Sequence, residues 1–182
     1  MEKHLILHCS PTLAGIKTAS LFSYTFLSEK ALACSLRSVN ETLVPRGIRA
    51  EVLRIQENNA LIFVYRESLL SAALCKNEVD KFLAGYGYSG NSVRQHITRL
   101  KSRLASCCAF PHEIGVFLGY PLPDVIGFIE NNGRNSKCAG CWKVYCDEYE
   151  AVRLFAKFQK CKSVYTRMFL QGRPIERLIV AA

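Results

Sequence analysis

The stretch Phe110-Pro-His-Glu-Ile-Gly-Val-Phe-Leu-Gly-Tyr-Pro-Leu-Pro-Asp-Val125 sets glycine, proline and charged residues into an otherwise apolar sequence. It predicts a short helix over 114–118, because Gly119 can end a helix in the left-handed conformation and Pro121 blocks its continuation. Asp124 then lies at the start of the next helix. Two helix starts separated by a tight turn bring backbone amides, an imidazole and two carboxylates into one small region.

His112 is the side chain in this stretch that can give or take a proton near neutral pH. Glu113 or Asp124 can orient its ring, which is an arrangement suited to general acid–base catalysis. The same residue types also cap helices and satisfy buried backbone groups. His112, Glu113 and Asp124 are therefore candidate catalytic residues, and structural capping is the alternative.

Four more residues are assigned to the same site as candidate ligand-binding residues. Tyr120 belongs to the stretch itself, whereas Lys17, Arg66 and Lys143 would bring cations from other parts of the chain. Cations beside helix N-termini favour a small anionic ligand. The leading interpretation is therefore a protein that binds such a ligand, and whether it is also an enzyme stays open.

The rest of the chain predicts a single α+β domain over residues 1–182. Ser28 can cap a helix whose apolar residues recur at helical spacing until 45–47 stops it. The alternating residues 48–52 and the apolar run 60–65 favour a β-hairpin. We find no repeat, low-complexity tract or linker, and we expect a small mixed or antiparallel sheet packed by several helices.

Helix signals and hydrophobic periodicity predict the remaining elements. Asp147 is expected to cap a late helix that carries Val152, Phe155 and Phe158 inward. The other predictions are a turn or short helix opened by Ser10 as N-cap with Pro11, strands over 20–26, 142–146 and 177–181, and helices over 69–74, 79–83, 93–104 and 163–172.

Composition excludes several classes of protein. The chain is 49% hydrophobic and 21% charged, unlike disordered proteins, and its formal charge of +9 favours anionic partners. The longest apolar run is 60–65, far shorter than the roughly 20 residues of a membrane helix. The N-terminus lacks the apolar core of a signal peptide. We therefore expect a cytoplasmic protein with no membrane partner.

The nine cysteines suggest a second class of function. Cys138 and Cys141 have the C-x-x-C spacing of zinc and redox sites, and Cys146 and Cys161 can complete a four-thiolate set. The pair precedes a predicted strand, however, and no second C-x-x-C exists. Reduced thiols are the preferred interpretation, a metal or redox protein is an alternative, and no cofactor is assigned. Cys107-Cys108 is expected to pack at a helix end.

Binding to nucleic acid is a further alternative. A predicted helix exposes Arg94, Arg99, Lys101 and Arg103, which can contact phosphates without reading sequence. Most such runs are solvated helix faces. The G-x-G-x-x-G match at 85–90 follows a predicted helix rather than the strand of a dinucleotide fold, so it indicates an ordinary turn between helices.

Several segments together resemble a domain-of-unknown-function family of anaerobic bacteria. The resemblance is nearly full-length, so it implies one continuous domain and supports the choice of site residues, but it implies no activity. Cysteines 138 and 141 are not part of the family pattern, which weakens the metal interpretation. The matching positions are 110–115, 117–121, 124–125, 127–128, Pro11-Thr12-Leu13, Lys17, Tyr65-Arg66, Gly85-Tyr86, Gly140 and 142–145.

Overall fold

The computed structural model describes residues 1–90, 92–106 and 109–180, and it confirms the α+β class with a small antiparallel sheet. The α-helices are α1 (Glu2–Leu13), α2 (Glu29–Leu43), α3 (Glu67–Leu74), α4 (Asn77–Ala84), α5 (Val93–Ser106), α6 (Ile114–Phe117), α7 (Leu122–Glu130) and α8 (Glu148–Leu170). The strands are β1 (Ala19–Thr25), β2 (Ile48–Gln56), β3 (Asn59–Arg66), β4 (Cys138–Ala139) and β5 (Lys143–Val144), and short 3-10 helices are η1 (Val44–Arg46) and η2 (Ile175–Arg177).

The central sheet contains the predicted hairpin and one earlier strand. β3 lies in the middle, and β1 and β2 pair with it antiparallel on either side. Ala19 of β1 and Arg49 of β2 both lie opposite Tyr65. The β2 ladder shifts register between Val52 and Arg54, where an extra residue is accommodated. The predicted strand over 20–26 is confirmed as β1.

The outer edge of β2 is covered at one residue by a side chain from α2. The Asn40 amide donates a hydrogen bond to the Ala50 carbonyl at 2.9 Å and accepts one from the Ala50 amide at 2.9 Å. A neighbouring strand would make the same pair of backbone hydrogen bonds. Asn40 therefore occupies the hydrogen-bonding groups of this edge residue.

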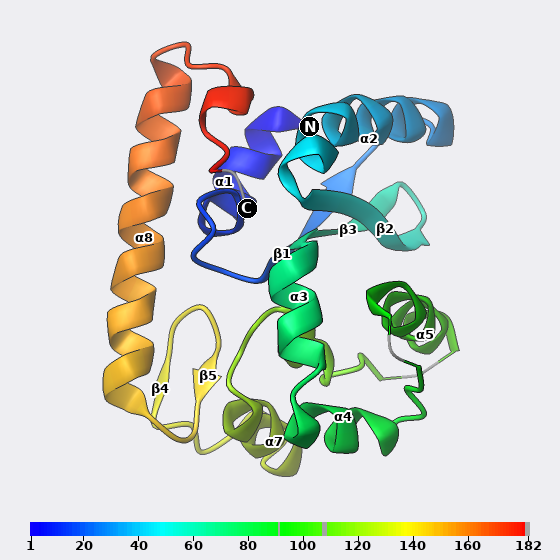
Figure 1. The fold of residues 1–182 in the computed structure, drawn as a ribbon, viewed down its shortest axis with the longest axis vertical. Helices are drawn as coiled ribbons and strands as arrows, with labels where there is room; N and C mark the ends of the chain where they lie inside the picture. The colour runs from blue at the N-terminus through cyan, green and yellow to red at the C-terminus, as the bar shows by residue number, and fades with distance from the viewer. Residues whose placement is uncertain (91, 107–108, 181–182) are drawn as a thin grey trace.

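The two faces of the sheet belong to two hydrophobic cores. Ile62 and Val64 of β3 face a core that also contains buried residues of α1, α2 and the C-terminal segment. Phe63 and Tyr65 point to the opposite face, where helices α3 to α7 complete a second core. Figure 1 shows α1 and α2 above the sheet and α3, α4, α5 and α7 below it. Strand alternation therefore divides the molecule into three layers.

Helix α8 runs along one side of all three layers (Figure 1). In its first half, Ala151 and Phe158 pack in a third small core with the β4–β5 hairpin, and near its end Phe169 packs against the first core. Ser163 lies inside this helix, and its hydroxyl donates a hydrogen bond to the Gln159 carbonyl one turn earlier. It therefore does not cap a new helix. The prediction of a separate helix over 163–172 is wrong. Within the described residues, no helix has the length and apolar character needed to cross a bilayer.

Two predicted helix caps are confirmed. Ser28 accepts a hydrogen bond from the Ala31 amide at 3.2 Å, and Asp147 accepts one from the Glu150 amide at 3.0 Å. Both caps satisfy amides that the first turn leaves without a partner. Val152 of α8 is 52% exposed, however, so its predicted inward orientation is wrong. Ala151, about 100° away around the helix, takes the buried side.

The prediction that Ser10 and Pro11 begin a helix is also wrong. Both residues lie in the last turns of α1, where Pro11 removes one backbone hydrogen bond and the Ser10 hydroxyl donates to the Ile6 carbonyl. α1 buries Leu5, Ile6, Cys9 and Leu13 almost completely. Burial of this apolar face offsets the lost bond, so the helix continues through the proline.

The C-terminal segment does not form the strand predicted over 177–181. It forms the 3-10 turn η2, and then Leu178 and Ile179 are both buried in the first core. In a strand, successive side chains point to opposite faces, whereas here two consecutive side chains are buried in the same core. The segment is therefore held by contacts other than strand pairing. The Val180 amide donates to the Leu13 carbonyl at 3.0 Å, which attaches the segment to the end of α1. Residue 181 lies outside the described residues.

Candidate functional site

The 110–125 stretch folds into two helices joined by a tight turn, as predicted. α6 ends before Gly119, and α7 begins after Pro121. Gly119 has φ +79°, a conformation that residues with a side chain rarely adopt. A Cβ at this position would lie 2.6 Å from the Thr18 hydroxyl. The turn therefore requires glycine both for its backbone conformation and for the close approach of the loop before β1.

A pocket of about 380 Å³ lies between this stretch and the β4–β5 hairpin. The strand predicted over 142–146 is shorter than expected, because only Lys143 and Val144 form β5. Most of the pocket wall is apolar or aromatic. The lining residues are Leu21, Phe110, His112, Ile114, Gly115, Leu118, Tyr120, Asp124, Val125, Phe128, Ala139, Gly140, Trp142 and Lys143.

Aromatic contacts organise the pocket wall. The rings of Tyr120 and Trp142 stack with centroids 4.8 Å apart, and Trp142 meets Phe155 of α8 edge-on at 4.5 Å. The His112 ring lies 4.8 Å from that of Phe128 and is exposed at the mouth. A Cβ on Gly140 would approach the Phe155 ring to 2.3 Å, so the hairpin can reach α8 only because this residue is glycine.

Asp124 is buried in the pocket wall and fastens the hairpin to α7. One carboxylate oxygen accepts hydrogen bonds from the backbone amides of Tyr145 and Cys146 at 2.7 and 2.9 Å, and the other accepts one from the Trp142 indole at 2.7 Å. Burial raises the pKa of Asp124, but these hydrogen bonds lower it by more, so the pKa lies below its ordinary value. The geometry gives Asp124 a structural task in the ionised form.

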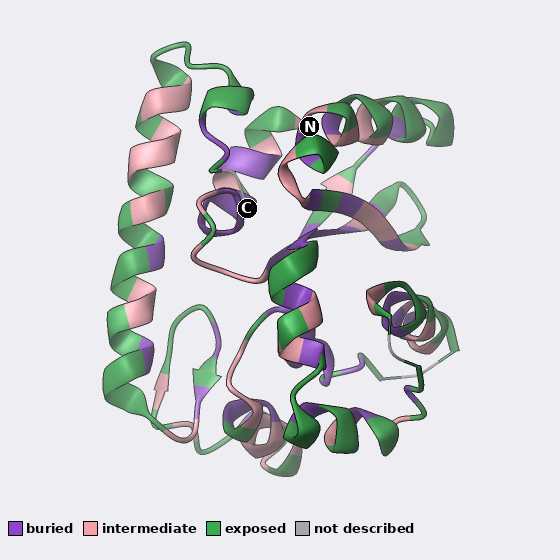
Figure 2. Ribbon diagram, in the orientation of Figure 1, coloured by how far each residue is buried: buried purple, intermediate pink, exposed green. Residues whose placement is uncertain are grey.

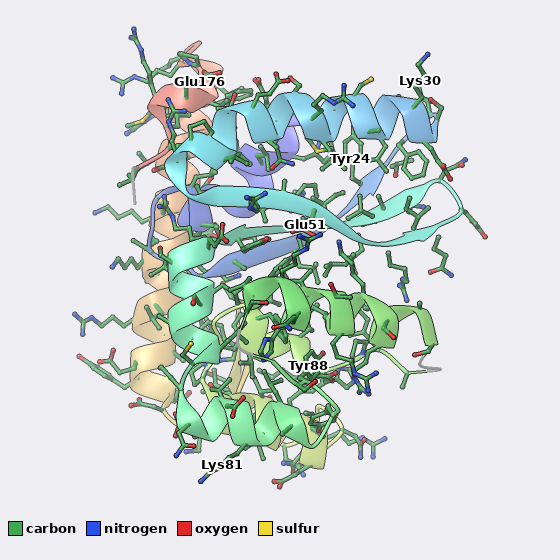
Figure 3. The ribbon with its side chains drawn as sticks, turned by 45° about the vertical axis from the view of Figure 1, so that its right-hand side comes forward. Tyr24, Lys30, Glu51, Lys81, Tyr88 and Glu176 are labelled. Carbon is green, nitrogen blue, oxygen red and sulfur yellow. The ribbon has the colours of Figure 1, made fainter. Side chains whose placement is uncertain are left out.

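Glu113 lies outside the pocket lining and belongs to the second core. It is 1% exposed, forms an ion pair with Arg103 of α5 and accepts a hydrogen bond from the Tyr88 hydroxyl at 3.1 Å. Figure 3 shows Tyr88 within the lower helical layer. Burial and the neighbouring Glu113 carboxylate raise the pKa of Tyr88. Among the described residues, no carboxylate forms a hydrogen bond with the His112 ring, so its acid–base role stays a prediction.

The predicted cations occupy three different environments. Lys143 lines the pocket, is exposed, and donates a hydrogen bond to the Gly133 carbonyl. The Lys17 amine lies 5.3 Å from the centroid of the Tyr120 ring, beside the pocket wall. Burial lowers the pKa of Lys17, although nearby thiols act in the opposite direction. Lys143 therefore reaches the pocket directly, and Lys17 lies behind one of its aromatic side chains.

Arg66 is absent from the pocket lining and makes its side-chain contacts elsewhere. Its buried guanidinium donates hydrogen bonds of 2.7 Å to the carbonyls of Thr12, Leu13 and Val180. These carbonyls belong to the end of α1 and to the C-terminal segment, where helix carbonyls lack partners within the helix. Arg66 thus joins the end of α1 to the C-terminal segment, and it does not line the pocket.

The cysteines are distributed over several elements. Cys138 and Cys141 lie on the β4–β5 hairpin, Cys146 follows it, and Cys161 lies in α8; all four have free thiols. No cluster of three or more histidine, cysteine, aspartate or glutamate side chains suited to a metal ion occurs in the described part of the chain. The predicted packing of Cys107-Cys108 lies outside the described residues.

The cations predicted on α5 are mostly engaged within the protein. Arg99 donates to the Tyr86 carbonyl at 2.9 Å, and Lys101 pairs with Glu51 at 2.7 Å. Figure 3 shows Glu51 on the sheet face toward α5. Arg103 pairs with the buried Glu113 described above. These contacts leave α5 few cations with which to bind a phosphate backbone.

Apart from Lys143, sequence reasoning missed the part of the pocket that comes from outside the central stretch. Phe128, Gly140 and Trp142 form much of its wall, but they lie up to three elements away from the helix turn along the chain. The resemblance included all three positions without giving them a role. An aromatic residue close to a glycine in a short hairpin was the signal that could have found Gly140 and Trp142.

Comparison with known proteins is informative at the level of family. A family model described as "Protein of unknown function (DUF3793)" matches residues 5–179. This chain belongs to that family. The DUF3793 match spans the central sheet, the pocket and α8. No curated protein and no solved structure matched the chain.

Proposed function

We propose that this protein binds a small organic anion with a flat apolar body in the pocket between α6, α7 and the β4–β5 hairpin. The observation that carries the proposal is an aromatic cavity of about 380 Å³ whose mouth bears His112 and Lys143. Small-molecule pockets of roughly 300–1,000 Å³ commonly combine apolar walls with a few polar groups that fix orientation.

The charge preference follows from which polar groups remain available. Both oxygens of Asp124 already accept hydrogen bonds from the hairpin, so this acid is not free to bind a cationic ligand. The Lys143 ammonium has three donors and uses one for the Gly133 carbonyl. His112 can also donate a hydrogen bond. The available groups at the mouth therefore favour a ligand with a carboxylate or similar anion.

The apolar part of the ligand would lie against the aromatic wall. Phe128 and Trp142 offer ring faces or edges, and aromatic pairs contribute about 0.5–1.5 kcal/mol beyond area burial. The proposal gives His112 a binding role, because no carboxylate among the described residues orients its ring for proton transfer. The proposal includes no chemical reaction of the bound ligand.

Trp142 is the single tryptophan of the chain and lines the pocket, so its fluorescence reports directly on occupancy. We would titrate the protein with benzoate, benzyl alcohol and benzylamine, which share a ring and differ in charge. Benzoate is expected to bind at least about tenfold more tightly than the other two, equivalent to about 1.4 kcal/mol. Equal affinities for all three, or no response to any, would contradict the proposal.

Two variants separate the pocket from general electrostatics. Lys143→Met should remove most of the preference for benzoate over benzyl alcohol, and His112→Gln should reduce it. The matched control is Lys137→Met, because Lys137 also donates to a backbone carbonyl near the hairpin but lies outside the pocket lining. If Lys137→Met loses the preference for benzoate as fully as Lys143→Met does, the preference results from net charge and not from the pocket.

A further inference from the structure

Helix α8 carries a stripe of cations on its exposed side. Arg153, Lys157, Lys160 and Arg167 follow each other at intervals of four, three and seven residues, which places them on one face of a helix. All four are exposed. We name them the α8 stripe. At 1.5 Å per residue, the stripe extends over about 21 Å.

The charge of the α8 stripe is scarcely neutralised within the protein. Arg153 approaches Glu150 at 3.3 Å, but both side chains are largely exposed, so this pair is weak. Among the described residues, Lys157, Lys160 and Arg167 have no ion pair or hydrogen-bond partner for their charged groups. This differs from α5, where Lys101 and Arg103 pair with acids. Figure 2 shows α8 at the margin of the molecule, exposed or half-buried along most of its length.

Uncharged polar groups lie beside the stripe. A groove of about 490 Å³ between α1 and the second half of α8 is lined by Ser163, Thr166, Lys162 and Arg167, among others. Arg167 thus belongs to both the stripe and the groove. Hydroxyl and amide side chains next to cations are typical of surfaces that contact phosphate and sugar groups.

We propose that the α8 stripe is a docking surface for the phosphate backbone of double-stranded nucleic acid, independent of its sequence. A duplex carries one negative charge per roughly 1.7 Å of its axis, so it can meet all four cations along a rigid helix. An anionic membrane is less suitable, because the exposed apolar residues of α8 form no continuous face: Tyr149 and Val152 lie in its first turns and Leu170 about 30 Å from Tyr149 along the helix.

The test is fluorescence anisotropy with a labelled random-sequence DNA duplex at several salt concentrations. If four phosphates are neutralised, the logarithm of the binding constant should fall with the logarithm of salt concentration with a slope of about −3.6. Between roughly 50 and 200 mM salt, affinity should then fall by about two orders of magnitude. Lys157→Glu with Lys160→Glu should lower affinity by at least about tenfold and reduce the slope by about two.

The matched control reverses two exposed lysines elsewhere, Lys30 and Lys81, which point outward from opposite ends of the molecule in Figure 3. Each pair of Lys→Glu changes lowers the net charge equally, from +9 to about +5. The control should retain duplex affinity within about threefold. Circular dichroism measures whether each variant folds. If the variant with Lys157→Glu and Lys160→Glu does not fold, a variant with Lys157→Gln and Lys160→Gln is used in its place.

Three outcomes would overturn the proposal. One is failure of the wild-type protein to bind the duplex at the lowest salt concentration. Another is an equal loss of affinity in the Lys30 and Lys81 control, which would mean that net charge alone is responsible. The third is binding to phosphatidylserine vesicles without binding to the duplex, which would assign the stripe to a membrane surface. None of these outcomes bears on the aromatic pocket, so the two proposals are tested separately.

Discussion

Replacing Asp124 should lower the stability of the protein much more than a lost helix cap would. Asp124→Ala leaves the Trp142 indole and the amides of Tyr145 and Cys146 without the acceptor that they use at 2.7 to 2.9 Å. A buried donor left unpaired costs about 1–3 kcal/mol; the Tyr145 and Cys146 amides are part-buried, so their costs lie toward the lower end, and the three costs are not fully additive. We expect a loss of about 3–5 kcal/mol in the free energy of unfolding.

Urea unfolding followed by Trp142 emission measures this loss, because the tryptophan lies at the affected contact. The matched control is Asp147→Ala, which removes the N-cap of α8 and should cost about 1 kcal/mol. If Asp124→Ala costs no more than this control and leaves the emission of the folded protein unchanged, then Asp124 does not fasten the hairpin. A selective effect on ligand affinity would instead support the catalytic or binding role predicted from the sequence.

The same carboxylate should contribute a pH dependence. Its folded-state pKa is lowered, so its contribution is fully present above the unfolded-state value of about 3.9 and is lost as pH falls through the folded-state pKa. The stability difference between wild type and Asp124→Asn should therefore be constant near neutral pH and shrink below about pH 4. A stability difference between wild type and Asp124→Asn that grows as pH falls would contradict a lowered pKa of Asp124 in the folded protein.

Four further substitutions test other contacts by the same unfolding measurement. Glu113→Gln should cost about 3 kcal/mol, because it removes the charge of a fully buried carboxylate that is ion-paired with Arg103, whereas Glu150→Gln, in an exposed ion pair, should cost less than about 1 kcal/mol. Equal effects would contradict the burial argument. Gly140→Ala should cost about 1–3 kcal/mol by forcing Phe155 aside, and an unchanged midpoint would refute that contact. Ser28→Ala should cost about 1 kcal/mol, and no loss would mean that water replaces the cap.

The elements that sequence reasoning predicted well are those with a strong local signal. Ser28 and Asp147 cap their helices through their own side chains, and the 48–66 hairpin shows alternation over adjacent residues. α1 was misjudged because a local signal, Ser10 with Pro11, was outweighed by burial against distant strands. Such a burial face depends on tertiary packing that no local window contains.

The candidate site shows the same division. His112, Tyr120, Asp124 and Lys143 all line the pocket. The first three lie close together because the turn between α6 and α7 joins them, whereas Lys143 reaches the pocket from β5. Glu113 could not be separated from them by sequence, since neighbouring residues after a proline can face opposite sides of a chain. Its partner comes from α5, and the recognition of that ion pair requires the fold. The role of each site residue stays a prediction that the titrations above address.

The amide of Asn40 has a consequence for how molecules of this protein meet one another. At Ala50 it takes both hydrogen bonds through which a strand from a second molecule would join β2. An incoming strand would have to dislodge a side chain held by a whole helix and would regain only the bonds already made there. Sheet-to-sheet growth, the usual hazard of an open edge, is therefore interrupted along β2 by a single residue that imitates a strand.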